Sequence, residues 1–358
     1  MRGSTWIGRL SLWRAATHIL GRAANHCFTL AANRSHVRLA TLSIALTAGF
    51  PPAPVAMAQS YPAKPLRLVI DTAPGGVTDI LARVIAQSLQ TSWGKTVFVE
   101  NKPGADDLIG TEFVAKSAPD GHTLLVVSNS PFSAGPHIHK DMRFDPAKDL
   151  MPLVLLGSAT PVMNVPAASP VKTVRDFIAM AKEKPGFYNY ASMGNGTYPH
   201  IAMEDFKIRT GTNIQHVPYR GATPAITALL QSEVASLIVN MSNVGEYVKA
   251  GQVRVIAAAG AQRSKMFPDL PTVAESGVPG FATGNWWGLF GPSGLPPAIV
   301  EKIRADVNRA LSGMEAERLY ATQTLERVNL QPEQYAAFMR EDFERHGEQI
   351  RAANVRKE

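Results

Sequence analysis

Short apolar runs that alternate with helix-like segments constrain the fold of this chain more than any other feature. The runs 66–70, 97–100 and 124–127 each end in a turn. Helical periodicity follows the first of them clearly, with apolar residues three and four positions apart. This alternation is typical of α/β proteins with parallel strands. The roughly 300 residues after position 58 exceed one comfortable core, so we expect two lobes.

The second half of the chain continues the same pattern. No long Pro- or Ser-rich linker separates the halves, which favours lobes joined by chain crossings within strands and C-terminal helices that return to the first lobe. The segment 128–136, rich in Ser, Pro and Gly, is expected to form a loop. Strands are predicted at 188–192, 214–218, 234–240 and 253–259, and helices at 109–118, 171–184, 198–209, 224–230, 297–311 and 332–352.

The excess of positive charge belongs to the first 58 residues. The whole chain has 36 Lys and Arg against 29 Asp and Glu, and six of the basic residues but none of the acidic ones lie before position 59, which leaves 30 against 29. A nucleic-acid-binding surface needs basic residues clustered on the folded part of a protein. We therefore expect no nucleic-acid partner.

The N-terminal segment has the features of an export signal. Arg34 and Arg38 precede the apolar run 39–50, which is too short to span a bilayer. Residues 56–58, Ala-Met-Ala, then match a signal-peptidase pattern, which predicts cleavage before Gln59 and a periplasmic protein. The alternative, a buried N-terminal helix, conflicts with three prolines directly after the apolar run.

The single cysteine, Cys27, lies in this leader. The mature chain therefore has no disulfide, cysteine nucleophile or cysteine metal ligand, which suits an oxidising compartment. Residues 1–33 lengthen the signal greatly, and a translation start near Val37 is an alternative hypothesis.

Two glycine-rich turns stand directly before predicted helices, one in each half of the chain, at residues 74–79 and 194–197. Glycine lets a ligand approach the backbone, and a helix N-terminus offers free N–H groups and a positive dipole end to an anion. Either turn alone is more often structural. Neither is a P-loop, because no Gly-Lys-Ser/Thr follows.

Catalytic motifs are absent from the sequence. His137 and His139 could suggest a metal pair, but no supporting carboxylate spacing occurs, so a polar loop is the preferred interpretation. His200 is interpreted as a packing or hydrogen-bonding residue, and Trp286 and Trp287 as either cleft-lining or core residues. No nucleophile elbow or dinucleotide fingerprint occurs. We expect no catalytic residue, no metal and no cofactor.

The order of several motifs resembles one known family over residues 61–355. The motifs include Tyr-Pro-Ala-Lys-Pro at 61–65, Pro-Gly-Gly-Val-Thr-Asp at 74–79, Glu-Asn-Lys-Pro-Gly-Ala at 100–105, Ala-Pro-Asp-Gly-His-Thr-Leu-Leu at 118–125, Gly-Asn-Gly-Thr at 194–197 with His200, His-Val-Pro-Tyr-Arg-Gly at 216–221, Phe-Pro-Asp-Leu-Pro-Thr-Val at 267–273 and Gly-Pro-Ser-Gly-Leu-Pro-Pro at 291–297. In these motifs the chain resembles the substrate-binding proteins of tripartite tricarboxylate transporters, the Bug family.

The resemblance implies a type II periplasmic-binding-protein fold, with two α/β lobes and a ligand cleft between them. It also implies partnership with membrane permease subunits and a small carboxylate ligand held by loop backbone groups and waters. We expect a leader over 1–58, lobe 1 over 59–161, lobe 2 over 162–283 and a return to lobe 1 over 284–358, in a monomer. The ligand-binding residues so implied are Pro74, Gly75, Gly76, Thr78, Asp79, Ser128, Asn129, Ser130, Gly194, Asn195, Gly196, Thr197, Ala222, Thr223 and Asn240.

The sequence also departs from the family pattern. Asp106 and Asp107 stand where the family usually has glycines, and Asn240 stands where an Asp is common. Asp71 likewise replaces a Pro or a small residue. Two carboxylates facing an anion would repel it by about 1 kcal/mol each at 4 Å in water. Either they face solvent or cap the next helix, or the ligand carries a cationic or hydrogen-bond-donating group, as an amino acid does.

Uptake of a small organic acid is the function that these observations favour. A ligand-sensing co-receptor for a sensor kinase would use the same liganded state, so it remains an alternative. A periplasmic enzyme that acts on small acids is the weaker alternative, because no nucleophile–base motif is present.

Overall fold

The structure is a computed structural model that describes residues 61–104 and 108–355. All of these residues belong to one compact unit of the chain, 58–358. The predicted leader over 1–58 with its cleavage before Gln59, and the acidic pair Asp106 and Asp107, lie outside the described residues.

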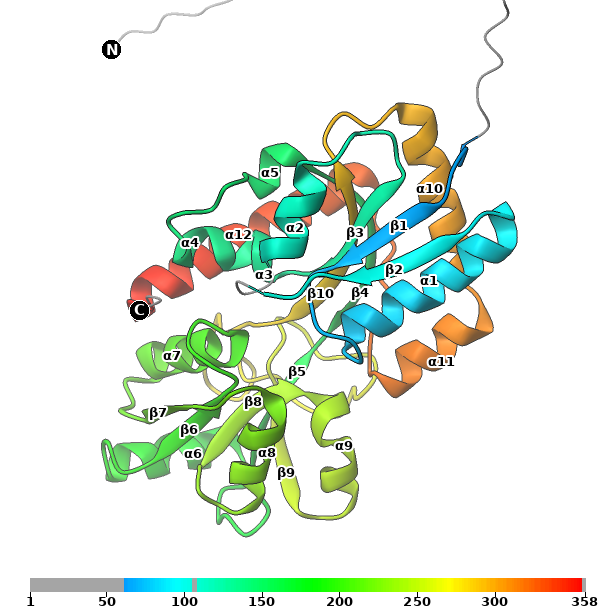
Figure 1. The fold of residues 1–358 in the computed structure, drawn as a ribbon. Coiled ribbons are helices and arrows are strands. Elements are labelled where there is room, and N and C mark those ends of the chain that lie inside the picture. The colour runs from blue at the N-terminus through cyan, green and yellow to red at the C-terminus, as the bar shows by residue number, and fades with distance from the viewer. Residues whose placement is uncertain (1–60, 105–107, 356–358) are drawn as a thin grey trace, which may run out of the picture. The chain divides into compact units, whose positions relative to one another are not determined.

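Two five-stranded sheets form the framework of this unit (Figure 1). We call the sheet β2-β1-β3-β10-β4 and its helices lobe 1, and the sheet β7-β6-β8-β5-β9 and its helices lobe 2. In each sheet three neighbouring strands pair in parallel, and β10 in lobe 1 and β5 in lobe 2 run antiparallel to both of their neighbours, so four of the five strands share one direction. The strands are β1 (Leu66–Ile70), β2 (Val97–Asn101), β3 (Thr123–Ser128), β4 (Leu150–Ala159), β5 (Pro161–Pro166), β6 (Asn189–Ser192), β7 (Gln215–Pro218), β8 (Ser236–Asn240), β9 (Val253–Ala258) and β10 (Asn285–Pro292).

Helices follow most of the strands, as the alternation in the sequence predicts. Lobe 1 contains α1 (Val77–Trp93), α2 (Leu108–Ala115), α3 (Ser130–Ser133), α4 (Gly135–Ile138), α5 (Pro146–Asp149), α10 (Pro297–Ala310), α11 (Met314–Thr322) and α12 (Pro332–Ala353). Lobe 2 contains α6 (Val174–Glu183), α7 (Tyr198–Thr210), α8 (Ala222–Leu230) and α9 (Met241–Lys249). The predicted two-lobed α/β architecture is confirmed.

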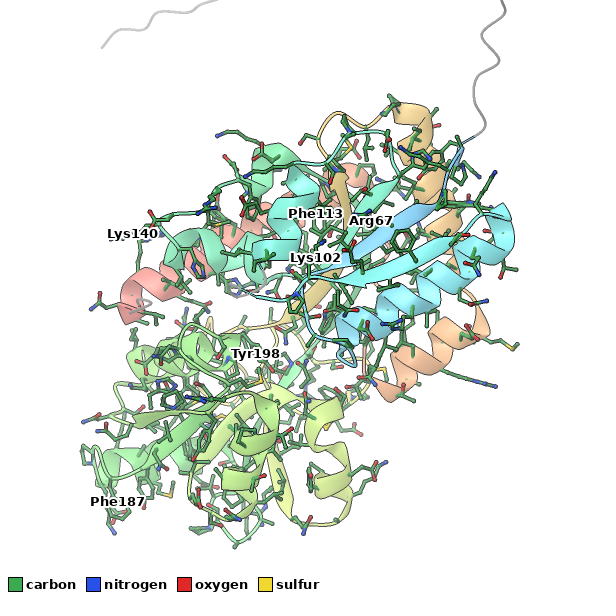
Figure 2. All side chains as sticks on the ribbon, viewed as in Figure 1. Arg67, Lys102, Phe113, Lys140, Phe187 and Tyr198 are labelled. Carbon is green, nitrogen blue, oxygen red and sulfur yellow. The ribbon has the colours of Figure 1, made fainter. Side chains whose placement is uncertain are left out.

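Strand β2 forms one edge of the lobe 1 sheet, and cation–aromatic contacts cover the face that it shares with α2 (Figure 2). The Arg67 guanidinium lies 5.6 Å from the ring centroid of Phe98 and 5.5 Å from that of Phe113, and Lys102 Nζ lies 4.5 Å from the Phe113 centroid. Glu100 forms ion pairs with both cations. Such charged groups at a sheet edge discourage edge-to-edge pairing with another chain.

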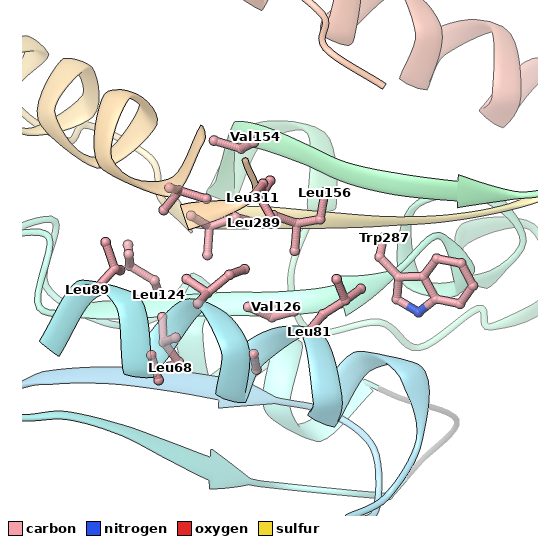
Figure 3. Packing of buried hydrophobic residues seen from close by; sticks show 14 of the residues in the cluster. Leu68, Leu81, Leu89, Leu124, Val126, Val154, Leu156, Trp287, Leu289 and Leu311 are labelled. Carbon is pink, nitrogen blue, oxygen red and sulfur yellow. The ribbon is translucent and has the colours of Figure 1, made fainter. Parts of the chain in front are cut away.

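Helices cover both faces of the lobe 1 sheet. Leucines of β1, β3, β4 and β10 pack on one face against α1, α10 and α11, as Figure 3 shows for Leu68, Leu124, Leu156 and Leu289. On the other face Phe290 packs with residues of α2, α3 and α12. Burial of apolar surface on both faces accounts for the near-continuous apolar runs in these strands.

Lobe 2 has the same three-layer construction. Phe177 of α6 and Phe206 of α7 pack on one face of its sheet, and Ile226 of α8 and Val244 of α9 pack on the other. The helix α6 begins with a capping box, in which the Thr173 hydroxyl accepts a hydrogen bond from a first-turn N–H. This cap explains why the helix predicted from residue 171 begins three residues later.

The segment 128–136 differs from the prediction of an irregular loop. It contains the short helices α3 and α4, each with a proline in its first turn. Proline fits this position because its missing N–H would have no partner within the helix there. The Asn129 carbonyl accepts the N–H groups of Phe132 and Ser133 and so starts α3.

The long helix α12 contacts both lobes. Its Asp342 accepts hydrogen bonds from lobe 1 residues, whereas Gln349 donates to Asp205 of α7 at 3.2 Å and to the Ala282 carbonyl at 3.1 Å. A small apolar cluster joins Ile350 of this helix to Ile201 of α7. The C-terminal helix therefore ties lobe 2 to lobe 1 on one side. No helix within 61–104 and 108–355 is long and apolar enough to span a membrane.

Candidate functional site

The carboxyl ends of the parallel strands define where a ligand site is expected. In open α/β sheets, ligands bind outside these ends, where loops lead into helix N-termini. In lobe 1 the ends of β1 and β3 carry residues 71–76 and 128–130, and in lobe 2 the ends of β6 and β8 carry 193–197 and Asn240. Most of the residues implied by the family resemblance therefore lie at the carboxyl ends of the parallel strands. We call these two places the sheet edges of the site.

The first glycine-rich loop is open at its surface. Pro74, Gly75 and Gly76 are exposed, and a Cβ atom added to either glycine would meet nothing within 4 Å. Gly75 adopts a φ of 94°, which favours glycine, whereas Gly76 is the N-cap of α1 in extended conformation. The loop thus presents backbone and the first turn of α1 without side chains in front of them.

Asp79 holds this loop in place from behind. Its carboxylate accepts the Gly75 N–H at 3.1 Å, forms a two-pronged ion pair with Arg83, and accepts from Asn101 Nδ2 at 3.3 Å. The hydrogen bond from Arg83 is the main cause that lowers the pKa of Asp79. Asp79 and Thr78 are both buried. These two side chains therefore lie beneath the loop and not on its exposed surface.

The end of β3 is anchored to the start of β10. Asn129 is buried, its main-chain N–H donates to the Trp286 carbonyl at 3.0 Å, and its side-chain amide lies 3.5 Å from the Gly284 carbonyl. Ser128 and Ser130 on either side are partly exposed. Their hydroxyls are the polar side chains that this edge of lobe 1 offers.

The second glycine-rich loop is held by a buried serine. Ser192 Oγ accepts the Gly194 N–H at 3.2 Å, and the Thr197 hydroxyl donates to the Gly194 carbonyl at 2.7 Å. The Gly196 N–H donates to His200 Nδ1 at 3.0 Å. Gly194 and Gly196 have φ angles of 129° and 76°, and Asn195 between them is exposed. The prediction that His200 is a hydrogen-bonding residue is confirmed.

A stack of three aromatic rings packs against the buried side of the second glycine-rich loop. The His200 and His216 rings are parallel with centroids 4.0 Å apart, and Tyr190 stacks on the other side of His216 at 4.9 Å. His216 Nε2 lies 2.6 Å from Ser192 Oγ. Because Ser192 is fully buried and bonded to the loop backbone, this contact braces the turn and leaves the hydroxyl inaccessible to a substrate.

The stack makes stability depend on pH. Burial, followed by the neighbouring His200, lowers the pKa of His216 from 6.5 to about 4. Below about pH 6.5 the unfolded chain therefore binds a proton at this histidine, whereas the folded chain binds it only near pH 4. The free energy of unfolding is therefore highest above pH 6.5 and decreases as the pH falls toward 4. Burial lowers the pKa of His200 in the same direction.

We expect the free energy of unfolding, measured by urea denaturation, to fall between pH 7 and pH 5, and His216→Asn to reduce that slope. The limit for one group is about 1.4 kcal/mol per pH unit. An unchanged slope in His216→Asn would contradict this assignment.

Two hydrogen bonds link the carboxyl end of β3 in lobe 1 to the carboxyl end of β8 in lobe 2. Asn129 of lobe 1 reaches Gly284, and the next residue, Asn285, donates its side-chain amide to Asn240 Oδ1 at 3.1 Å. These contacts run from the end of β3 to the end of β8. Elsewhere, a Cβ at Gly196 would lie 3.2 Å from Ile138 Cδ1 of α4. The second glycine-rich loop therefore lies where the lobes meet, and the first glycine-rich loop follows β1, the strand that pairs with β3.

Ala222 and Thr223 occupy the first turn of α8, after Gly221 with a φ of 103°. Thr223 is exposed and Ala222 is partly exposed. Their helix N-terminus lies next to the β6–β7 edge, since the Tyr219 N–H donates to the Ser192 carbonyl.

Sequence reasoning missed Tyr198, His216 and Asn285 as parts of this region. Tyr198 is the first residue of α7, directly after the second glycine-rich loop, and this adjacency was the available signal. The tryptophans Trp286 and Trp287 are both buried, in the cores on opposite faces of the lobe 1 sheet. Core packing is therefore the correct alternative for them.

The His137 and His139 pair has no metal site around it. Among residues 61–104 and 108–355, no group of three His, Cys, Asp or Glu side chains could hold a metal ion. His137 Nε2 lies 3.0 Å from the Phe343 carbonyl, and its ring packs on the Phe343 ring. This histidine therefore connects α4 to α12.

Comparisons with known proteins agree with this arrangement. BugT of Bordetella pertussis is 34% identical over 319 residues, which cover 89% of this chain and 98% of that protein. The R. palustris protein Rpa4515 with adipate has a TM-score of 0.73 at 28% identity, over 83% of this chain and 100% of that one. MatC of Rhodopseudomonas palustris with bound malate has a TM-score of 0.69 at 28% identity, over 81% and 100%. Residues 81–355 match the profile described as the tripartite tricarboxylate transporter family receptor, and the chain belongs to this family.

Proposed function

We propose that this chain is a periplasmic receptor that captures one small organic acid where its two lobes meet and delivers it to a tripartite tricarboxylate-type permease. The observation that carries the proposal is the convergence of the two sheet edges through Asn129, Gly284, Asn285 and Asn240. Each sheet carries a glycine-rich loop and a helix N-terminus at the carboxyl end of its parallel strands. A helix N-terminus favours a bound anion, so the N-termini of α1 and α7 could each bind a carboxylate of one ligand.

The charge balance of the loops supports an anionic ligand. Asp79 contacts the first loop by accepting the Gly75 N–H, and Arg83 neutralises its carboxylate in a two-pronged ion pair. The α1 dipole then acts on an incoming carboxylate with little opposition. Relatives with adipate and with malate bound are consistent with a dicarboxylate or hydroxy-acid ligand. The proposed ligand site consists of the fifteen residues implied by the family resemblance. Among them, Thr78 and Asp79 stabilise the first glycine-rich loop from the buried side.

The remaining features of the proposal follow from the family and the chain. We propose export to the periplasm with cleavage before Gln59, action as a monomer, and lobe boundaries at 161/162 and 283/284. The end of β4 at Ala159, the start of β5 at Pro161 and the start of β10 at Asn285 lie within three residues of those boundaries. Sensing through a membrane kinase would use the same liganded form and is the alternative role.

A ligand screen on mature protein 59–358 tests this proposal. The protein is unfolded and refolded to remove any bound ligand, and its melting temperature is then measured with organic acids and amino acids. An acid at 100 times its dissociation constant should add about 2.7 kcal/mol of stability. We expect a stabilising carboxylate that mass spectrometry recovers unchanged after incubation. No stabilisation by any of these acids, or turnover of the ligand, would contradict the proposal.

A further inference from the structure

His200 holds the backbone of the second glycine-rich loop through one ring nitrogen. The loop directly precedes Tyr198, which Figure 2 labels at the start of α7. The Gly196 N–H donates a hydrogen bond to His200 Nδ1 at 3.0 Å, and a ring nitrogen that accepts carries no proton. His200 is therefore neutral in this arrangement. Protonation would place an N–H at Nδ1 opposite the Gly196 N–H, and this hydrogen bond could not form.

The surroundings of His200 disfavour its protonated form. Its ring stacks on that of His216 of β7, with the centroids 4.0 Å apart and the planes 6° apart, so two charged rings would repel each other. Burial is the main cause that lowers the pKa of His200 below 6.5. The ring therefore takes up a proton in mildly acidic solution and is neutral at pH 7.

The charged neighbours of the two rings largely neutralise each other. After burial, Glu204 raises the pKa of His200 and Lys207 lowers it, and these two side chains of α7 form an ion pair at 2.7 Å. Glu204 also accepts a hydrogen bond from the Tyr190 hydroxyl of β6 at 2.6 Å. Burial raises the pKa of Tyr190, so this phenol adds no charge. Little net charge therefore remains beside His200 to stabilise an imidazolium.

Other charged groups of α7 have partners away from the loop. Asp205 forms an ion pair with Arg209 at 2.8 Å and accepts a hydrogen bond from Gln349 of α12. The strand β8 and the helix α8, which pack beside β6, contain no titratable side chain. We therefore attribute the proton sensitivity of the loop to His200 and its neighbour His216.

The same loop also approaches lobe 1. A Cβ at Gly196 would lie 3.2 Å from Ile138 Cδ1 of α4. The neighbouring His137 packs its ring on Phe343 of α12, with the centroids 4.2 Å apart. Movement of Gly196 would therefore disturb the place where the second glycine-rich loop meets lobe 1.

We propose that His200 positions the second glycine-rich loop for the ligand, and that protonation of His200 releases this loop and lowers the affinity of the receptor. The proposal rests on the proposed function, because the loop must contribute to ligand binding for its release to matter. His200 acts through the loop backbone and needs no contact with the ligand. The receptor then binds its acid most tightly in neutral solution and more weakly as the medium becomes mildly acidic.

Calorimetric titration between pH 7.5 and pH 5 tests the proposal, with malate and adipate, the acids bound by two relatives, and with any acid identified by the screen. His200→Asn is the matched variant, because asparagine Oδ1 and histidine Nδ1 are both attached to Cγ, and Oδ1 accepts an N–H but does not titrate. Over this range we expect the Kd of wild type to rise about 3- to 10-fold more than that of His200→Asn. One proton can change an affinity by at most about 10-fold per pH unit. The carboxyl groups of the ligand titrate equally in both experiments and cancel in the comparison.

His200→Ala separates positioning from the titration itself. It removes the acceptor of the Gly196 N–H at every pH, so it should bind about 5-fold more weakly than wild type at pH 7.5, the loss expected for one hydrogen bond. Its affinity should then follow the same pH profile as that of His200→Asn. Weak binding by His200→Ala together with normal binding by His200→Asn at pH 7.5 would show that the acceptor matters and the ring does not.

A measurement without ligand tests the release of the loop directly. In wild type, the amide NMR signal of Gly196 should shift with the same midpoint as the ring signals of His200. In His200→Asn the Gly196 signal should stay in place over that pH range. A Gly196 signal in wild type that does not follow the His200 ring would overturn the release.

The outcomes separate this proposal from the proposed function. If wild type binds an acid with the pH profile of His200→Asn, the role of His200 is overturned and the receptor function stands. The role is also overturned if His216→Asn alone abolishes the additional pH dependence, because the proton then acts at His216. If wild type binds no acid of the screen at pH 7.5, the receptor proposal fails, and the role of His200 in affinity fails with it.

Discussion

Replacement of Asp342 by alanine is expected to lower the free energy of unfolding by about 3 kcal/mol. Asp342 is 1% exposed, and its carboxylate accepts hydrogen bonds from Ser133 Oγ, from Trp286 Nε1 at 2.8 Å and from Arg345. Its removal leaves a buried hydroxyl and a buried indole N–H without an acceptor, and each unsatisfied group costs about 1–3 kcal/mol. Urea denaturation at pH 7 measures the loss.

Asp306→Ala provides the control for this prediction. Asp306 likewise accepts from a tryptophan, Trp93, at 2.6 Å and from two cationic side chains, Lys302 and Arg309. Arg309 is largely exposed and Lys302 is partly exposed, so water hydrates both cations after the carboxylate is lost, and we expect a cost of about 1 kcal/mol. Equal losses in both variants would show that Asp342 does not have the central role in attaching α12 to lobe 1.

Replacement of Gly76 by leucine is expected to weaken ligand binding by about 10- to 100-fold with little effect on folding. Gly76 has a φ of −80° and a ψ of 171°, which any residue adopts, and its Cβ position is open. A leucine there would stand in front of the first turn of α1, where the proposed ligand carboxylate lies. Forcing extra atoms into a fitted site costs about 1–3 kcal/mol, which corresponds to that loss of affinity.

Gly313→Leu is the matched control for this change. Gly313 is the exposed N-cap of α11, with a φ of −83° and a ψ of 160°, and it lies at none of the proposed contacts. A Cβ at Gly313 would lie 3.3 Å from the Ala310 carbonyl oxygen, so Gly313→Leu should melt no higher than Gly76→Leu without ligand. If Gly76→Leu binds the acid as tightly as Gly313→Leu does, the first glycine-rich loop does not contact the ligand.

The architecture of lobe 1 could be predicted from the sequence only in part. Strands β1 and β3 are short apolar runs between turns, and their prediction is confirmed. Strand β10 escaped prediction because it contains two glycines and no alternation, since all its residues are buried. The structure supplies the reason, because a Cβ at Gly288 would lie 2.1 Å from Tyr335 Oη. Close approach by a residue 47 positions later cannot be inferred from local pattern.

The same distinction applies to the candidate site. The glycine-rich loops are local features, and the sequence places them correctly before α1 and α7. The contact between Asn285 and Asn240 joins residues 45 positions apart, and no periodicity signals it. Strands β4 and β5 were not predicted, because the prolines at 152 and 161 argue against strands in the sequence pattern. Proline is nevertheless tolerated at both positions, since β4 is an edge strand and Pro161 is the first residue of β5.

The central claim is that one unmodified carboxylate binds jointly to both lobes. Isothermal titration calorimetry of refolded protein 59–358 with the acid identified by the screen tests it most directly, when wild type is compared with Gly76→Leu in lobe 1 and Asn240→Ala in lobe 2. We predict one acid bound per chain and a clear loss of affinity in both variants. Loss in only one variant, or a stoichiometry of two, would contradict a single site shared by the lobes.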